Sequence, residues 1–443
     1  MRPNKDFPYS VKQTPVNERL TITLAVLRVC HCSTLFNGIF HLWNFTNLYV
    51  LSGESRLKFD NWCGLDSGTV IRKWSFQMPS LDSYFNDIDD PRRGNAPRHK
   101  FCDLMTISLL CALCGGETAV DMELFGQMKE DFLREFLELP HGIPCHDAYS
   151  RLFRLMKPTS FQAFFDKFRA DFASASGEEP AIAIDGKEMR RSFDRAAGQS
   201  NMNIVTAFAH GARLTLGISQ SAKGGGEILA LRELIEMLDI RGITITADAL
   251  HCQRETCELI VQEGGDYCLQ LKGNQGDMLA DVQAFVEDHN TDYIDEYDTI
   301  DADHGRIEER SYRVYDVPQY LIDIHDWPHL QAFVHVVSRR TTGDKTSRCE
   351  RLYLLSKCHT AQTAASLIRG HWQIENSLHW SLDVVMNDDQ HRARKDRAPA
   401  NFAALRRVAL NIIKANPAKG SNRGKFKKAG WSNEFLKTLM QGF

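Results

Sequence analysis

Apolar residues recur every three or four positions over residues 101–176, and this spacing predicts a bundle of about four helices. The recurrence is carried by FCDLMTISLLCALC, FGQMKEDFLREFLEL, HDAYSRLFRLM and SFQAFFDKFRADFASA. Gly142 and Pro144 interrupt it between the second and third segments. SASGEEP then has the composition of a linker.

The hydrophobic period changes after residue 177. Three short apolar runs (AIAID, NIVTAFAH, RLTLGIS) predict strands, and an amphipathic helix (EILALRELIEMLDI) follows. Strand GITITAD, helix CQRETCELIVQEGG and strand DYCLQLK come next. This order predicts a mixed five-stranded sheet, with three antiparallel strands and then two parallel strands reached by helical crossovers. Residues 292–358 read mostly as strand, and a helix from about Ala361 to Val385 follows.

These changes of pattern divide the chain into regions. Residues 1–77 mix Cys, Trp, Phe and Asn without sustained periodicity, and we take this irregular extension to be upstream DNA translated from an early start, with Met78 as the natural start. A peptide from before Met78 in the native protein would contradict that hypothesis. We expect a helical domain at 78–176, an α/β domain at 177–390 with a β-rich insertion at about 292–358, and a basic helical segment at 391–443.

Composition is that of an ordinary soluble globular protein, with 43% hydrophobic and 25% charged residues and a net charge of -4. The distribution of charge is more informative than its sum. From His391 to Lys428 there are twelve Lys or Arg residues and one acid, Asp396. Such a segment is either a face for nucleic-acid phosphates or a solvated basic tail.

The spacing of the cysteines and the length of the apolar stretches argue against a zinc protein and a membrane protein. The twelve cysteines are irregularly spaced, and Cys111 and Cys114 lie in an apolar helical run, so buried thiols in a reducing cytoplasm are favoured over a zinc site. The apolar stretch from Leu20 to Leu51 is interrupted by polar residues, and no membrane span is predicted.

Two acids occupy corresponding places in the predicted sheet. Asp185 follows AIAI and Asp248 follows ITITA, each after a buried-type strand. An unpaired carboxylate beside a core strand is costly, although one alone could be a turn or helix cap. Ligand sites of open α/β sheets collect at the carboxyl ends of strands, so the two carboxylates converge if the first and fourth strands are neighbours.

A third acid follows the sheet. Glu375 lies in IRGHWQIENSLHWSLDVV, where a helix places His371 and His379 one turn to either side of it. Three carboxylates make an oxygen-rich site that selects Mg²⁺ or Mn²⁺, and two such ions promote in-line phosphoryl displacement. The competing interpretation is a metal site built from His371, His379 and Glu375, which leaves the aspartates without a role.

Seven short motifs, in order, resemble the H-repeat-associated transposases of bacterial insertion sequences. They are DDPRR, GIPCHDAYSRLF, AIDGK, DALHCQ, LKGNQG, HGRIEER and HWQIENSLHW, and they run from about Met78 to the basic C-terminal region. The resemblance implies the DDE transposase superfamily, whose catalytic domain is like RNase H. It also implies a strand-rich insertion between the second and third acids.

The resemblance implies that Asp185, Asp248 and Glu375 are the catalytic residues and metal ligands, holding two Mg²⁺ or Mn²⁺ ions. Relatives in the wider superfamily carry a Tyr, Arg, Glu, Lys signature around the third acid. Here the corresponding positions are Ile368, His371, Glu375 and Leu382. Because of this departure, nearby Asp383, Asp388 and Asp389 stand as alternatives for the third acid.

Several polar residues are candidates for contacts with DNA. LKGNQG could hold a phosphate or form a plain turn, and strand alternation in HGRIEER gives one face that is either DNA-facing or solvated. The residues after Asp185 are phosphate contacts or ordinary surface. The candidates are Lys187, Arg190, Lys272, Asn274, Gln275, His304, Arg306, Arg310, Arg369, His371, Arg392, Arg394 and Lys395.

The sequence therefore predicts an enzyme that hydrolyses DNA at insertion-sequence ends and transfers the freed strand to target DNA. We expect double-stranded DNA as its partner, a homo-oligomer on DNA, no membrane association, and a bacterial cytoplasmic, nucleoid-associated location. Two alternatives remain: an RNase H-like nuclease that cuts without joining, and an inactive DNA-binding remnant of a mobile element.

Overall fold

The strands that carry the two aspartates lie side by side, as the order of elements predicts. In the computed structural model, β1 (Ala181–Met189) pairs in parallel with β4 (Thr244–Ala247), and β4 pairs in parallel with β5 (Asp266–Leu271). On its other edge β1 pairs antiparallel with β2 (Met202–Ala209), which pairs antiparallel with β3 (Thr215–Ser221). The strand order β3-β2-β1-β4-β5 confirms the RNase H-like mixed sheet.

The structure describes residues 85, 88–92, 98–175, 180–193, 198, 200–221, 226–303 and 305–441. The proposed extension at 1–77, its start at Met78 and the phosphate candidate His304 lie outside these residues. The described residues belong to one compact unit, Gln77–Phe443.

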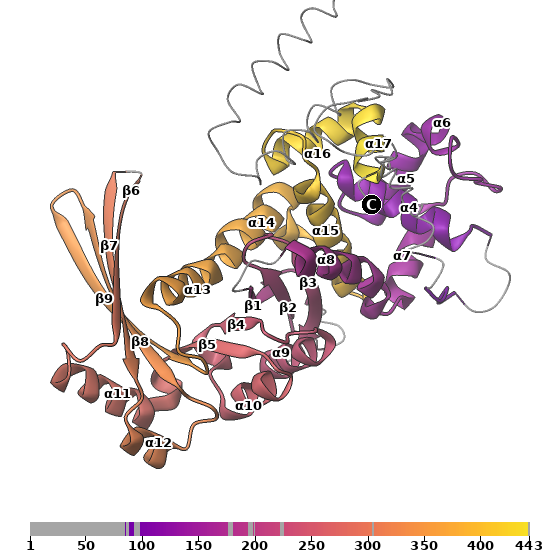
Figure 1. Cartoon of the computed structure of the whole chain (residues 1–443). Coiled ribbons are helices and arrows are strands. Elements are labelled where there is room, and N and C mark those ends of the chain that lie inside the picture. Colours follow the sequence, from indigo (N-terminus) through magenta and orange to yellow (C-terminus); the bar gives the residue numbers. More distant parts are fainter. Residues whose placement is uncertain are drawn as a thin grey trace, which may run out of the picture. The chain divides into compact units, whose positions relative to one another are not determined.

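The insertion extends the sheet instead of forming a separate one. It contributes β6 (Asp295–Asp303), β7 (Arg306–Asp316), β8 (Ala332–Thr342) and β9 (Lys345–Leu355), all antiparallel to their neighbours. Because β9 pairs with β5, the sheet has nine strands in the order β3-β2-β1-β4-β5-β9-β8-β7-β6, where the sequence predicted five. The long hairpins of the insertion extend beyond the central strands (Figure 1).

Strand alternation gives the central sheet two different faces. Ile182 and Ile184 of β1 share a core with α9 (Gly226–Met237) and α10 (Arg254–Gln262), whereas Ala183 belongs to the opposite core. Asp185 has the parity of Ala183, so its side chain leaves β1 toward the second face. That face is covered by α13 (Ala361–Gln373) and α15 (Ala398–Ala415).

The helical region packs with the end of the chain. Its helices are α4 (Phe101–Leu113), α5 (Ala119–Met128), α6 (Glu130–Leu133), α7 (His146–Leu155), η1 (Pro158–Phe161) and α8 (Gln162–Ala175). They share one core with α15, α16 (Asn422–Trp431) and α17 (Asn433–Gln441), as the purple and yellow helices of Figure 1 indicate. The basic C-terminal segment is thus only partly a surface, because Arg406, Arg407 and Lys425 are buried.

Four further elements lie between strands: η2 (Ala249–His251), η3 (Gly273–Gln275) with α11 (Gly276–Asp288), and α12 (Gln319–His325). The helix expected from Ala361 to Val385 is present but not uniform. It consists of α13, the π-helical turn η4 (Ile374–His379) and α14 (Trp380–Met386), and η5 (Asp388–Gln390) follows.

Candidate active site

The two aspartates occupy adjacent positions in the sheet. The last paired residues of the parallel β1–β4 ladder are Ile184 and Ala247, so Asp185 and Asp248 follow directly at the same level. Asp185 accepts a hydrogen bond from Gly186 N (2.9 Å), and Asp248 accepts one from Leu250 N (3.0 Å) at the start of η2. These bonds leave carboxylate oxygens of both residues available to a ligand.

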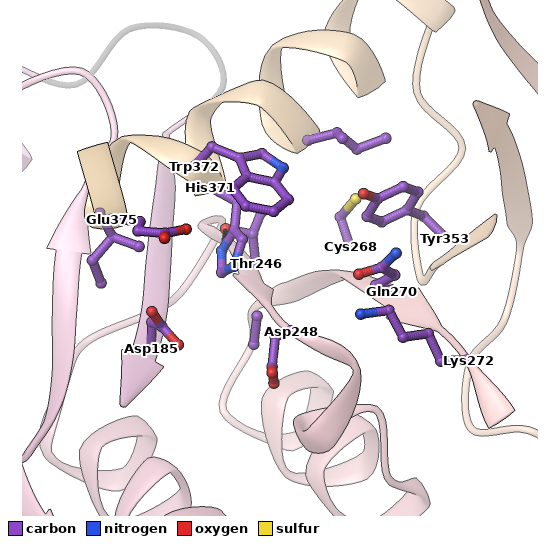
Figure 2. A pocket seen from close by; sticks show the side chains of 13 residues that line it. Asp185, Thr246, Asp248, Cys268, Gln270, Lys272, Tyr353, His371, Trp372 and Glu375 are labelled. Carbon is purple, nitrogen blue, oxygen red and sulfur yellow. Dashed lines mark hydrogen bonds between the residues drawn. The ribbon is translucent and has the colours of Figure 1, made fainter. Parts of the chain in front are cut away.

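Glu375 approaches the two aspartates from the helix that covers this face of the sheet. It lies in the π-helical turn η4, and its side chain lines the same cavity as Asp185 (Figure 2). The cavity has a volume of about 210 Å³ and is lined by all three acids. A π turn inserts one residue into a helix and is frequent at functional sites, because it changes which side chains face the neighbouring element.

The carboxyl group of Asp185 is in an environment that disfavours its charge. Burial, and after it the negative charge of Asp248, raises the pKa of Asp185 to about 7. The nearest imidazole, His379, has Nδ1 3.7 Å from Asp185 Oδ2, but burial lowers its own pKa to about 3. A neutral imidazole does not balance the carboxylates, so the lining of the cavity combines three carboxyl groups with one cationic side chain, Lys272.

His371 also lines the cavity, but it is held as a neutral side chain. Burial lowers its pKa to about 4, and its Nδ1 lies 3.2 Å from Thr246 Oγ1 on β4. Thr246 Oγ1 in turn lies 3.1 Å from Nε2 of the partly buried His210. This chain of contacts joins α13 to β4 directly beneath the cavity.

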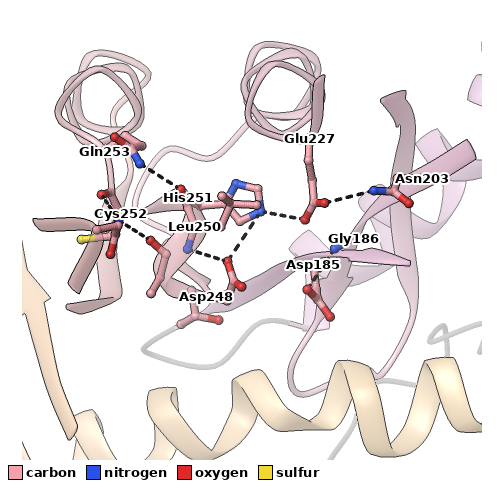
Figure 3. A network of polar contacts seen from close by, with 12 residues as sticks. Asp185, Gly186, Asn203, Glu227, Asp248, Leu250, His251, Cys252 and Gln253 are labelled. Carbon is pink, nitrogen blue, oxygen red and sulfur yellow. Dashed lines mark hydrogen bonds and ion pairs between the residues drawn. The ribbon is translucent and has the colours of Figure 1, made fainter. Parts of the chain in front are cut away.

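A fourth acid, Glu227, approaches the site from the first turn of α9 and was not found from the sequence. Asn203 Nδ2 donates to Glu227 Oε2 (3.3 Å), and Glu227 Oε1 lies 3.4 Å from Nε2 of the fully buried His251 (Figure 3). A Cβ at Gly186 would lie 2.4 Å from Glu227 Oε1, so glycine makes this approach possible. An acid on an amphipathic helix gives no sequence signal, although His251 stands in the motif DALHCQ.

The acids that stood as alternatives to Glu375 are engaged elsewhere. Lys187 Nζ lies 2.8 Å from carboxylate oxygens of both Asp383 and Asp389. Asp388 is buried and accepts a hydrogen bond from Arg406 Nε (2.6 Å). None of these three aspartates is among the residues that line the cavity.

The remaining phosphate candidates fall into different environments. Lys272 lines the cavity beside the acids (Figure 2), and Arg306, Arg310 and Arg369 line a larger groove next to it. The amide side chains of the LKGNQG turn, which were candidates for phosphate contacts, donate hydrogen bonds to backbone carbonyl groups. Asn274 Nδ2 donates to Ala249 O (2.8 Å) and Gln275 Nε2 to Cys252 O (3.1 Å), and both bonds fix the loop after Asp248.

The other basic candidates lie at the surface to different degrees. Arg190 is exposed, and Lys187 is buried in its ion pairs. Arg392 and Lys395 are exposed. Arg394 donates to Arg191 O (3.2 Å), and its guanidinium lies 4.6 Å from the centroid of the Phe193 ring.

The donor set fits a hard divalent cation better than zinc. It consists of carboxylate oxygens, and oxygen donors are the ligands that Mg²⁺ and Mn²⁺ prefer. Within the described ranges, no three His, Cys, Asp or Glu side chains lie together closely enough to hold one ion. Binding by all three acids therefore requires their side chains to draw closer.

Comparison with known proteins identifies the family. A model of the transposase DDE domain matches residues 176–412, and the DDE_Tnp_1-associated model matches residues 83–169. The chain is 34% identical over 374 residues to two proteins of Escherichia coli K12. These are YbfL and the "H repeat-associated putative transposase YhhI", and each match covers 83% of this chain and 99% of the relative. The chain belongs to the DDE transposase family, which confirms the resemblance in its motifs.

Further likenesses are weaker. An uncharacterized protein from the dhlA 3' region of Xanthobacter autotrophicus is 35% identical over 64% of this chain and 96% of its own length. A solved piggyBac transposase synaptic complex with hairpin DNA gives a TM-score of 0.35 at 10% identity, over 82% of this chain and 77% of that chain. This score is too low to establish a shared arrangement. No helix in the described ranges is both long and apolar enough to cross a membrane.

Proposed function

We propose that this chain is a transposase that cleaves DNA at the ends of its insertion sequence and joins the freed strand to target DNA. One observation carries the proposal: Asp185, Asp248 and Glu375 reach a single cavity from β1, the end of β4 and η4. Membership of the DDE transposase family supports the same chemistry.

In this proposal the three carboxylates are the metal ligands and the catalytic residues. Asp185, Asp248 and Glu375 would hold a pair of Mg²⁺ or Mn²⁺ ions, which would supply charge stabilisation to the attacking and leaving oxygens of an in-line displacement. Hydrogen bonds from Gly186 N and Leu250 N orient the aspartates, and a bound cation would stabilise the charged form of Asp185, which burial and Asp248 disfavour.

The two steps use the same bond rearrangement. In the first, a water oxygen bonds to the scissile phosphorus, the bond from phosphorus to the 3′-oxygen breaks, and that oxygen leaves as a 3′-hydroxyl after taking up a proton. In the second, this 3′-hydroxyl attacks a phosphodiester of target DNA, loses its proton and displaces the target 3′-oxygen. No covalent bond between protein and DNA is needed in either step.

The proposal extends to the neighbourhood and partners of the site. Lys272 lies in the cavity wall, where its ammonium can bind a phosphate oxygen next to the scissile bond. Double-stranded DNA is the partner, at the element ends and at the target, and the chain acts on it as a homo-oligomer. A bacterial cytoplasmic location, at the nucleoid, follows from that partner.

The test is a cleavage-and-joining assay on duplex DNA that carries the ends of the element encoding this chain. Wild type is compared in Mg²⁺ with Asp185→Ala, Asp248→Ala and Glu375→Ala, and with Asp344→Ala as a control at an exposed turn. We expect cleaved and joined products from wild type and the control. The three site variants should retain DNA binding in a mobility-shift assay and lose both products.

Other outcomes separate the alternatives. Cleavage without joined product would favour a nuclease, and binding without cleavage would favour an inactive remnant. One relative over 76 residues, at 28% identity, is named an inactive transposase. Full activity in Glu375→Ala would remove Glu375 from the site.

A further inference from the structure

A large groove lined by arginines lies beside the carboxylate cavity. Its volume is about 1170 Å³, and it is bounded by one face of the insertion strands and by α13 and η4. Alternation along the strands places Arg306, Arg310, Arg340 and Arg351 on this face. Arg369 of α13 and Arg213 of the turn between β2 and β3 complete the set, so six arginines face three acids, of which one is Glu375.

Two acids hold four of these guanidinium groups in place. Glu308 is only 7% exposed, and its carboxylate pairs with Arg306 (3.4 Å), Arg340 (2.8 Å) and Arg310. Asp301 pairs with Arg310 (2.7 Å) and Arg369. Because each carboxylate carries one charge and is shared among several guanidinium groups, the cluster keeps an excess of positive charge.

The other two arginines have no such partner. Neither Arg213 nor Arg351 forms an ion pair with an acid among the residues that the structure describes. An internal role in strand pairing explains guanidinium groups that are bound to Glu308, but it does not explain Arg351. A partly buried cation without an internal partner is suited to an external anion.

The groove and the carboxylate cavity are continuous. They share the wall residues Tyr353, Ile368, Trp372 and Glu375. Trp372, whose side chain is 45% exposed, stands at this junction (Figure 2). A polyanion that runs along the arginines therefore passes directly by Glu375.

We propose that this arginine groove holds the DNA backbone next to the scissile phosphate, with Arg340 and Arg351 as phosphate contacts that the sequence did not indicate. Glu308 and Asp301 act as positioning residues that fix the guanidinium groups before DNA arrives. The proposal rests on the proposed function for the identity of its ligand. Phosphates fit the groove because several fixed guanidinium groups along one wall match a repeating anion.

The strand alternation also supplies a matched control. Arg339 is the neighbour of Arg340 on β8, is likewise exposed, and faces the opposite side of the insertion, where it lines a separate hollow. Arg339→Ala removes the same charge from the same strand. The DNA affinity of this variant therefore shows the effect of a lost positive charge when the groove itself is unchanged.

The test measures the affinity of the full chain for labelled duplex DNA at several salt concentrations, without Mg²⁺ or Mn²⁺. Probes are a duplex with the element end and one of unrelated sequence. We expect Arg351→Ala, and more strongly Arg340→Ala with Arg351→Ala, to weaken binding several-fold. Each lost phosphate contact should reduce the slope of log affinity against log salt by about one. Arg339→Ala should keep the wild-type slope.

A second measurement places the DNA in the groove itself. In protein labelled with 5-fluorotryptophan, the ¹⁹F resonance of Trp372, assigned with Trp372→Phe, should shift on addition of the duplex. The proposal would be overturned if both arginine variants, with unchanged unfolding midpoints, kept the wild-type slope of log affinity against log salt. It would also be overturned if the Trp372 resonance did not move at saturating DNA. Since no cleavage is required, an inactive chain that still binds through the groove would contradict only the proposed function.

Discussion

Lys187 Nζ donates a hydrogen bond to Asp389 Oδ1 at 2.8 Å, and this ion pair joins the strand of Asp185 to the segment that follows Glu375. The Lys187 side chain is 9% exposed, and its Nζ is also 2.8 Å from Asp383 Oδ1 on α14. Although the sequence indicated a phosphate contact, this position suits a positioning role. The pair fixes β1 relative to α14 and η5, and so fixes Asp185 relative to Glu375.

We expect Lys187→Met to lower the free energy of unfolding by about 3 kcal/mol, because it removes the buried cation that two partly buried carboxylates share. Arg190 supplies the comparison, since it pairs with the same Asp389 at 3.4 Å but is 75% exposed. Arg190→Ala should cost less than about 1 kcal/mol. Urea unfolding of both variants checks this, and equal losses would show that burial of the pair is unimportant.

Substitution of Gly370 should disturb the contacts between α13 and β4 that support the cavity. A Cβ at this helical position would overlap Nδ1 of the partly buried His210, which contacts Thr246 in the wall of the cavity. We expect Gly370→Ala to destabilise the chain by about 1–3 kcal/mol and to slow cleavage, although alanine favours a helix. Gly276→Ala in α11 meets no atom within 4 Å and should be neutral or slightly stabilising. Thermal unfolding and single-turnover cleavage of both variants give the comparison.

The buried His391 should make the fold sensitive to acid. Burial, and after it the charge of Arg406, lowers the pKa of His391 to about 3, and its Nε2 donates to Glu117 O (3.1 Å). Between about pH 3 and the ordinary histidine pKa near 6.5, the unfolded chain binds a proton that the folded chain does not. The stability that His391 contributes is therefore present above about pH 6.5 and lost as the pH falls.

Comparison of wild type with His391→Gln isolates this effect from the other titrating groups. Relative to the variant, wild type should lose about 3 kcal/mol of unfolding free energy between about pH 7 and about pH 4. His329→Gln, at a half-exposed ring, controls for the substitution itself. Parallel stability profiles for wild type and His391→Gln would contradict the prediction.

Divalent cations should stabilise the protein through Asp185. Its pKa is raised to about 7, first by burial and then by Asp248, so the carboxylate is charged only above that pH. Ligands that bind only the folded state raise its stability, so the increase in melting temperature on adding Mg²⁺ should be larger at about pH 8 than at about pH 6. Asp185→Asn should abolish the increase and Asp344→Asn should retain it. An equal increase in Asp185→Asn would place the cation elsewhere.

Much of the fold could be predicted from hydrophobic period and element order. The runs AIAI and ITITA consist of small and β-branched residues because β1 and β4 are buried on both faces, and helical crossovers make their neighbours parallel. Once β1 and β4 are neighbours, the convergence of Asp185 and Asp248 follows from the register. The nine-stranded sheet could not be predicted in this way, because pairing of β9 with β5 is a contact between distant segments.

Side-chain environments were less predictable. The π turn at Glu375 is invisible to a helical pattern, because one inserted residue leaves most apolar spacings intact. Arg406 and Arg407 read as a basic surface, yet they are buried with Asp388 and Thr206, since local sequence does not show which charges find partners. Glu227 is a surface-type acid in sequence and approaches the site only because Gly186 makes room for it.

Replacement of Mg²⁺ by Fe²⁺ tests the central claim most directly, since bound iron with hydrogen peroxide as oxidant, and ascorbate to reduce the iron again, cuts the polypeptide near its ligands. In the full chain we expect fragments that end near Asp185, Asp248 and Glu375, all suppressed by excess Mg²⁺ and all absent in Asp185→Asn. That pattern would mean that the three carboxylates form one cation site. Cuts at other positions, or the same three cuts undiminished in Asp185→Asn, would contradict it.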